Sequence, residues 1–181
     1  FPRGKGTVYE GGLRVPMIVR WPGVAPAGKK KIELVSTIDI LPTALSAASI
    51  KAPANLPGWN LIPVLAGSPE PFWRRYIFGF TTGSFPRNCF IQHSLRDKRY
   101  KLISSPRPDT NNMIAGSYLD ETHPHFVISG ATTKDQATVS ESVKRAFALW
   151  SKPPRYELYD LKNDPNEWTN LANDPAYKEI K

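Results

Sequence analysis

One cysteine, three histidines and a few clusters of basic side chains are the residues of this sequence best suited to chemistry. Cys89 stands alone, so it can form neither an internal disulfide nor a cysteine-rich zinc site, and we interpret it as a small core residue on a strand. His123 and His125 have the spacing of two metal ligands, but no acidic or cysteine cluster lies beside them in the sequence. We therefore interpret this histidine pair as part of a loop without a metal.

Several common catalytic patterns have no counterpart in the sequence. It contains no pair of carboxylates of the glycosidase type, no serine, histidine and acid set with an elbow motif, and no glycine-rich phosphate loop. Basic residues, by contrast, are concentrated: sixteen lysines and arginines stand against six acidic residues up to position 110, and eight against ten after it. Such an excess favours an anionic partner, namely a phosphate, a sulfate, a sulfated glycan or a nucleic acid.

The composition fits a globular protein with a core large enough to position these residues. Hydrophobic residues make up 40% of the 181 positions and charged residues 22%, while eighteen prolines predict long irregular connections. No apolar run approaches the roughly 20 residues that a membrane helix requires, so no membrane span is predicted. The chain opens with Phe1-Pro2-Arg3 and lacks an initiator methionine, and we expect the natural N-terminus to lie upstream.

The pattern of apolar and turn-forming residues predicts short helices and strands. The expected elements are a buried strand at 15–21, a helix capped by Asp39, strands at 76–80, 90–95, 100–103 and 156–161, a helix that ends before Pro153, and helices starting at Asp164 and Asp174. The polar residues 96–99 have the length of a hairpin turn, which predicts an antiparallel pair over 89–104. The residues alone thus indicate a basic α+β domain with a preference for anions.

Residues 4–16 read Gly-Lys-Gly-Thr-Val-Tyr-Glu-Gly-Gly-Leu-Arg-Val-Pro. This segment resembles the second signature segment of the formylglycine-dependent sulfatases, which are relatives of alkaline phosphatase. Further segments resemble the same family in the same order, at 35–43, 96–103 and 157–172. Residues 147–150, which precede a pair of prolines, are similar to the heparan N-sulfatase-like subgroup.

The resemblance implies a fold and a division into domains. Residues 1–67 are expected to be the C-terminal part of the α/β catalytic domain of a sulfatase, with the boundary in the proline- and glycine-rich stretch 51–67. Residues 68–181 are expected to form an α+β subdomain with an antiparallel sheet. Because the strand at 15–21 is apolar on both faces, we expect its partners to lie upstream and its side chains to be exposed in this chain alone.

The resemblance also implies roles for individual residues. In the family, the lysine of the signature contacts the sulfate group and the oxygen that it leaves, and the matching residue is Lys5, which we expect to be catalytic. A fixed ammonium stabilises the negative charge that develops on a departing oxygen. Glu10 and Arg14 are interpreted as an ion pair or as backbone clamps that support this segment. The residues expected to bind substrate are Arg96, Lys98 and Arg99. For each of these three, a solvated hairpin turn is the alternative interpretation.

The complete protein is expected to hydrolyse a sulfate ester or a sulfamate, with a sulfated carbohydrate as substrate. The family makes formylglycine from the Cys or Ser of a C/S-x-P/A-x-R motif and uses a calcium-like ion, but this sequence has neither that motif nor a suitable acidic cluster. We therefore expect this chain alone to be inactive and to bind no metal. Two alternatives stay open: a fragment of a phosphomonoesterase or phosphodiesterase of the same superfamily, and a non-enzymatic polyanion-binding module.

The expected partners are the sulfated substrate and the N-terminal half of the sulfatase. A nucleic-acid partner is not expected, because no binding motif is present and the aromatic residues fall in core-like patterns. A membrane partner is not expected either. The resemblance implies a periplasmic, secreted or lysosomal-type location.

Overall fold

The structure is a computed structural model that describes residues 3–68, 73–82, 89–113, 115 and 138–181. The chain divides into two compact units: Phe1–Val15 together with Phe78–Lys181, and Pro16–Ile77. The first fifteen residues therefore belong to the same unit as the C-terminal part of the chain. The predicted domain boundary between residues 67 and 68 stays a prediction.

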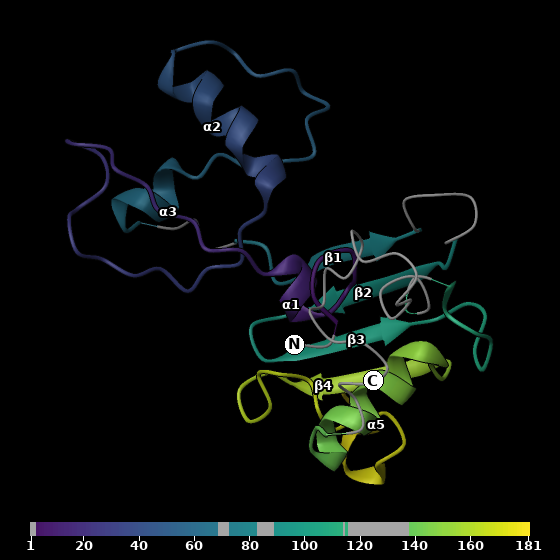
Figure 1. The fold of residues 1–181 in the computed structure, drawn as a ribbon. Helices are drawn as coiled ribbons and strands as arrows, with labels where there is room; N and C mark the ends of the chain where they lie inside the picture. The colour runs from purple at the N-terminus through teal and green to yellow at the C-terminus, as the bar shows by residue number, and fades with distance from the viewer. Residues whose placement is uncertain (1–2, 69–72, 83–88, 114, 116–137) are drawn as a thin grey trace. The chain divides into compact units, whose positions relative to one another are not determined.

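The larger unit is built on a four-stranded sheet with the order β1-β2-β3-β4 (Figure 1). The strands are β1 (Ile77–Thr81), β2 (Gln92–Arg96), β3 (Tyr100–Ser104) and β4 (Tyr156–Asp160). β2 and β4 both pair with β3 in antiparallel fashion. The predicted antiparallel-sheet subdomain is confirmed by this arrangement.

A tight turn at residues 97–99 joins β2 to β3. The Asp97 carboxylate accepts a hydrogen bond from the Arg99 N–H at 2.7 Å, and it also accepts one from the Tyr100 N–H. Aspartate favours such turns because its short side chain can bond the backbone two residues further on. The predicted hairpin over 89–104 is thus confirmed.

Alternation along the strands gives this sheet a covered and a more open face. On the covered face, which we call the inner face, Ser94 lies opposite Ile103 and Ile103 lies opposite Glu157. All three of these side chains are buried. On the other face Phe78 and Phe80 of β1 are exposed. Alternation of side chains along this strand therefore places two large aromatic residues on the surface.

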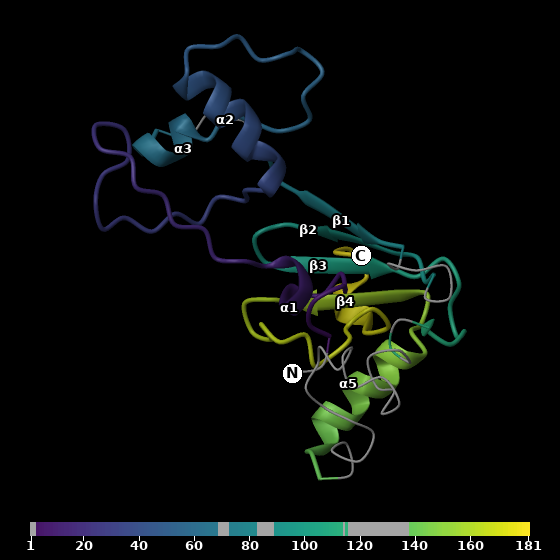
Figure 2. The same cartoon turned by 45° about the horizontal axis from the view of Figure 1, so that its top comes forward.

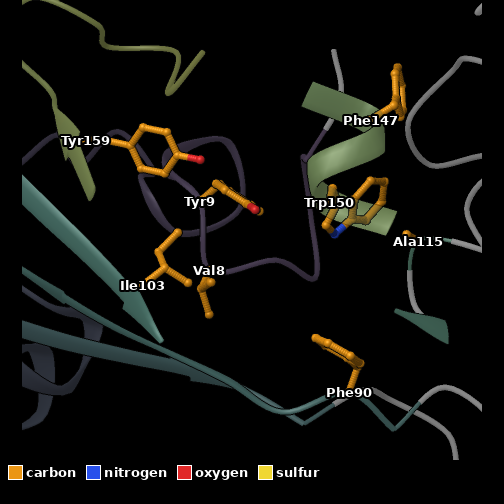
Figure 3. Close-up of a cluster of buried hydrophobic side chains, with 8 residues drawn as sticks. All are labelled: Val8, Tyr9, Phe90, Ile103, Ala115, Phe147, Trp150 and Tyr159. Atoms are coloured by element: carbon orange, nitrogen blue, oxygen red, sulfur yellow. The ribbon is translucent and has the colours of Figure 1, made fainter. Parts of the chain in front are cut away.

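The core of this unit lies against the inner face (Figure 3). α5 (Glu141–Ser151) contributes Phe147 and Trp150, which follow the predicted helical spacing. Val8 and Tyr9 belong to the same cluster, so the residues just before α1 (Glu10–Leu13) are part of this core. In Figure 2, α5 lies below β4, at the bottom of the view. The signature segment is consequently packed onto the C-terminal subdomain.

The smaller unit contains η1 (Thr37–Asp39), α2 (Ile40–Ala47) and α3 (Ile62–Ala66). Asp39 was predicted to cap the helix, but its carboxylate does not bond the amides of α2. Instead it accepts hydrogen bonds from the Ser36 N–H at 2.7 Å and the Trp59 N–H at 2.8 Å. It also pairs with the guanidinium of Arg74, so this fully buried carboxylate ties three segments of the unit together.

Two sequence-based predictions about elements are wrong. Residues 15–21 form no strand in the structure, and the helix predicted to start at Asp164 is replaced by turns. The helix predicted to start at Asp174 is present as the short 3-10 helix η5 (Pro175–Tyr177), with Asp174 as its N-cap. Cys89 is exposed and lies outside any strand, so its interpretation as a core residue is also wrong. The histidine pair His123 and His125 lies outside the described residues.

Within the part of the chain that the structure describes, none of the helices has the length and apolar character needed to cross a bilayer.

Candidate functional site

Lys5 lies at the exposed apex of a short loop formed by residues 3–10, which we call the lysine loop. The Thr7 hydroxyl closes this loop with hydrogen bonds to the backbone oxygens of Arg3 at 2.9 Å and Gly4 at 2.8 Å. Gly6 follows Lys5 with φ of 84°, a left-handed conformation that glycine adopts without steric cost. Lys5 is therefore exposed, while Arg3 at one end of the loop and residues 7–10 at the other are buried.

Arg3 anchors the start of the lysine loop. Its side chain is buried, and its Nη2 donates hydrogen bonds to the backbone oxygens of Asn166 at 3.1 Å and Glu167 at 2.6 Å. The guanidinium also lies over the ring of Tyr9, 4.3 Å from its centroid. Such a contact is favourable because the face of an aromatic ring carries partial negative charge.

Glu10 anchors the end of the lysine loop. Its carboxylate pairs with Arg96 at 2.7 Å and with Lys101 at 3.0 Å, which come from β2 and β3. The predicted ion pair with Arg14 is therefore wrong: within the described residues the Arg14 side chain is exposed, and only its backbone N–H bonds the Glu10 oxygen, at 2.8 Å. The reason is that the strand residues offer Glu10 cations inside the fold, where Coulomb attraction is stronger than at the surface.

Glu167 contacts both anchors. Its backbone oxygen accepts the Arg3 hydrogen bond, and its Oε2 accepts a hydrogen bond from the Glu10 N–H at 2.7 Å. Its Oε1 lies 3.1 Å from Lys101 Nζ, within ion-pair distance but without hydrogen-bond geometry. Burial is the largest influence on this carboxyl and raises its pKa, while Lys101 opposes that rise.

A third buried carboxylate, Glu157, lies on the inner face next to the lysine loop. The hydroxyl of Tyr9 donates to its two oxygens at 3.0 and 2.8 Å, and the hydroxyl of Tyr159 donates to it as well. Desolvation raises the pKa of Glu157 to about 7, although the tyrosine hydrogen bonds and the charge of Arg3 favour its ionised form. This carboxyl thus links the core tyrosines to the Arg3 anchor.

The three basic residues expected to bind substrate lie at the hairpin turn, but two of them have partners within the fold. Arg96 pairs with Glu10, as described above. Arg99 forms a two-pronged interaction with Asp160, through Nε at 3.1 Å and Nη2 at 2.8 Å, and this contact lowers the pKa of that carboxyl. Lys98 is exposed, and no ion pair of its ammonium occurs within the described residues.

The described residues do not fit the metal or the nucleophile that the sulfatase resemblance implies. Among them, no three His, Cys, Asp or Glu side chains are grouped so as to hold a metal ion. The carboxylates that hold the lysine loop, those of Glu10 and Glu167, are already balanced by Arg96 and Lys101. Lys5 itself is exposed, and within the described residues its side chain forms no ion pair.

Sequence reasoning singled out Lys5 and Glu10 but missed Arg3, Lys101 and Glu167. One signal was available for Lys101. Strand alternation places it on the same face as Ile103, and a charge on an apolar face indicates a buried ion pair. No comparable signal existed for Glu167, because its role depends on contacts with residues more than 150 positions away.

The family model described as "N-sulphoglucosamine sulphohydrolase, C-terminal" matches residues 4–115. An ulvan-active sulfatase from Formosa agariphila is 34% identical over 180 residues, which make up 98% of this chain and 32% of that relative.

Two solved structures share the fold. A phosphonate monoester hydrolase from Silicibacter pomeroyi superposes with a TM-score of 0.62 at 22% identity, covering 98% of this chain and 28% of its own. A protein solved in complex with its substrate D-glucosamine-2-N,6-O-disulfate superposes with a TM-score of 0.58 at 21% identity, covering 95% of this chain and 26% of its own. The chain thus spans a third or less of the length of these proteins.

The family match extends over more than half of the chain and includes the lysine loop from Gly4 onward. Residues 147–150, which suggested the heparan N-sulfatase-like subgroup, lie outside the match, so that finer assignment is a separate question. The chain belongs to the family of N-sulphoglucosamine sulphohydrolase C-terminal domains, within the sulfatases, as its resemblance predicted.

Proposed function

We propose that the complete protein hydrolyses a sulfate ester or sulfamate and that Lys5 contacts the sulfate group and its leaving oxygen. The observation that carries this proposal is the placement of Lys5 at the exposed apex of a loop whose two ends are buried and anchored in the sheet unit. A cation held in this way can strengthen its interaction as negative charge develops on the departing oxygen. Hydrolysis of a sulfate ester would break the bond from sulfur to that oxygen and give sulfate and an alcohol or phenol. Hydrolysis of a sulfamate would break the bond from sulfur to nitrogen and give sulfate and an amine.

We propose a sulfated carbohydrate as the substrate class. Support comes from the ulvan-active sulfatase among the relatives and from the fold neighbour bound to D-glucosamine-2-N,6-O-disulfate. Lys98 is the hairpin residue best placed to contact a second anionic group, because Arg96 and Arg99 are held by Glu10 and Asp160. A formylglycine and a divalent ion, where the complete protein holds them, would supply the nucleophile and the neutralisation of the sulfate. The expected periplasmic, secreted or lysosomal-type location stays a prediction.

The test is the Lys5→Ala substitution in the complete protein. We expect kcat on D-glucosamine-2-N,6-O-disulfate to fall by about 10²–10³-fold with little change in thermal stability, because one charged contact to a developing oxyanion is lost. The matched control is Lys29→Ala, which removes an exposed lysine of the smaller unit and should leave kcat unchanged.

Two results would contradict the proposal. One is a Lys5→Ala protein with the wild-type kcat. The other is a complete protein that cleaves a phosphonate monoester but no sulfate ester or sulfamate, which would favour the phosphate-hydrolase alternative. The 181-residue chain alone should turn over neither class of substrate, and any turnover by it would show that the catalytic groups have been misassigned.

A further inference from the structure

We propose that Glu167 is a positioning residue for Lys5, because it fixes both ends of the lysine loop from the opposite end of the chain. The inference rests on the proposed role of Lys5 and extends it to a residue that touches no substrate. Glu167 lies in the turns after β4, and its carboxylate and its backbone oxygen serve different anchors of the loop.

The geometry of Glu167 explains how one residue reaches both anchors. Its φ is 60°, a left-handed conformation that is sterically unfavourable for an L-residue other than glycine. Arg3, which bonds its backbone oxygen, has φ of 65° and lies in the same unusual region. Residues in this region persist only where surrounding contacts determine them. The hydrogen bond from Arg3 to the Glu167 backbone oxygen thus connects two residues whose left-handed backbones both require stabilising contacts.

The charges around Glu167 also favour a positioning role over a purely stabilising one. Glu167 and Lys101 are 2% and 1% exposed, and removing two charges from water costs several kcal/mol before their attraction is counted. In proteins generally, replacing a buried ion pair by apolar residues of similar volume is often neutral or stabilising. What the ion pair adds is direction, since the Glu10 N–H contacts one oxygen of the carboxylate and Lys101 lies next to the other. The start of α1 is thereby fixed relative to β3.

The consequence for Lys5 follows from the length of the loop. Only one residue separates Lys5 from Arg3, and four separate it from Glu10, so a shift of either anchor moves the lysine. Thr7 couples the two halves of the loop through its hydrogen bond to the Arg3 oxygen. A displacement of about 1 Å in a positioned group can cost on the order of 100-fold in rate. Loss of the Glu167 carboxylate should therefore act on the reaction through Lys5.

The experiment is a double-mutant cycle in the complete protein with Lys5→Ala and Glu167→Gln. Glutamine keeps the shape and can still accept from the Glu10 N–H, but it loses the charge that faces Lys101. We expect Glu167→Gln to lower kcat/KM by about 10- to 100-fold. We expect the double variant to be no slower than Lys5→Ala alone, because a residue that acts only through Lys5 has nothing left to position.

A second readout separates positioning from general destabilisation. Phenyl sulfate releases phenolate, which is more basic than the 4-nitrophenolate released by 4-nitrophenyl sulfate. The rate of its hydrolysis therefore depends more on a cation at the leaving oxygen. Both Lys5→Ala and Glu167→Gln should slow phenyl sulfate more than 4-nitrophenyl sulfate. Asp164→Asn is the matched control: it removes a carboxylate from the same segment, one that accepts from the Thr169 N–H at 2.8 Å, and it should keep wild-type rates.

A second variant covers the case in which Glu167→Gln folds poorly. Glu167→Gln combined with Lys101→Met removes both charges, so no buried charge loses its partner, while Glu10 keeps Arg96. It should show the same loss of rate and the same dependence on the leaving group.

The inference is overturned if Glu167→Gln keeps the wild-type kcat/KM. It is also overturned if the reductions in kcat/KM caused by Glu167→Gln and Lys5→Ala multiply in the double variant, or if Asp164→Asn reduces kcat/KM as much as Glu167→Gln does. It is also overturned if the two aryl sulfates are slowed equally by Glu167→Gln but unequally by Lys5→Ala. If Lys5→Ala itself shows no effect, or the complete protein hydrolyses no sulfate ester, the proposed function fails and takes this inference with it.

Discussion

Glu157 is a core residue whose protonation makes the stability of the fold depend on pH. It is fully buried between Tyr9 and Tyr159, and desolvation raises its pKa from 4.5 to about 7 in the folded chain. Between these two values the folded state binds more protons than the unfolded state. The contribution of this group to stability is therefore fully present below pH 4.5 and is lost as the pH rises through about 7.

We predict that Glu157→Gln removes this dependence. Glutamine can still accept hydrogen bonds from both tyrosines, but it does not titrate. The melting temperature of the wild type relative to the variant should fall as the pH rises from 4.5 to 7, which thermal denaturation followed by circular dichroism would measure. Glu141→Gln on the surface of α5 is the control, because the pKa of Glu141 is lowered by Lys144 and the side chain is solvated. A flat or rising difference for Glu157→Gln would contradict the prediction.

At the scale of single elements, sequence patterns predicted structure wherever local signals and packing agreed. Alternation from residue 90 to 104 was sufficient for β2 and β3, because the buried residues of these strands lie on one face. Residues 156–160 also form the predicted strand β4, although its residues 157–160 are buried on both faces. The spacing of Val143, Phe147 and Trp150 predicted α5 for the same reason: its apolar stripe packs on the inner face.

The helix predicted at Asp164 shows how tertiary contacts override a local signal. Asp164, Pro165 and Glu167 have the order of a helix start, with a cap, a first-turn proline and a third-position acid. In the structure Glu167 has a left-handed backbone conformation, and its carboxylate accepts a hydrogen bond from the Glu10 N–H rather than from a helix cap. The sequence could not reveal this, because the partner lies at the other end of the chain. The same long-range pairing explains why Arg3 was missed as an anchor of the lysine loop.

The packing of α5 gives a prediction at this scale. Trp150 is 1% exposed in the core cluster, so Trp150→Ala should lower the free energy of unfolding by about 3–5 kcal/mol. Phe78→Ala is the matched control, since Phe78 is another large aromatic residue of the same unit but is 62% exposed on the open face. Urea denaturation followed by far-ultraviolet circular dichroism would measure both. Equal losses would mean that α5 does not pack on the sheet as described.

At the scale of the whole molecule, the segment after the lysine loop is unusually apolar for its exposure. Ile18 is 95% exposed, and Val15 and Met17 are 65% and 45% exposed, although the sequence has the character of a buried strand. The expectation of exposed side chains there is confirmed, whereas the strand itself does not form in this chain. A strand needs partners for its backbone groups, and the described residues of this chain provide none at 15–21.

We therefore predict that parts of the complete protein outside this chain cover residues 15–19. The chain spans 32% of the ulvan-active sulfatase that it matches, which leaves ample sequence for such a cover.

Burying an isoleucine side chain contributes about 1.5–3 kcal/mol, and a buried aspartate in its place adds the cost of desolvating a charge. Ile18→Asp should consequently destabilise the complete protein by at least about 2 kcal/mol, measured by chemical denaturation. In the isolated 181-residue chain the same substitution should change the free energy of unfolding by no more than about 0.5 kcal/mol, because an exposed side chain has few contacts to lose. Equal effects in the two proteins would mean that the surface at 15–19 is exposed in both, and that the apolar character of the segment has another cause.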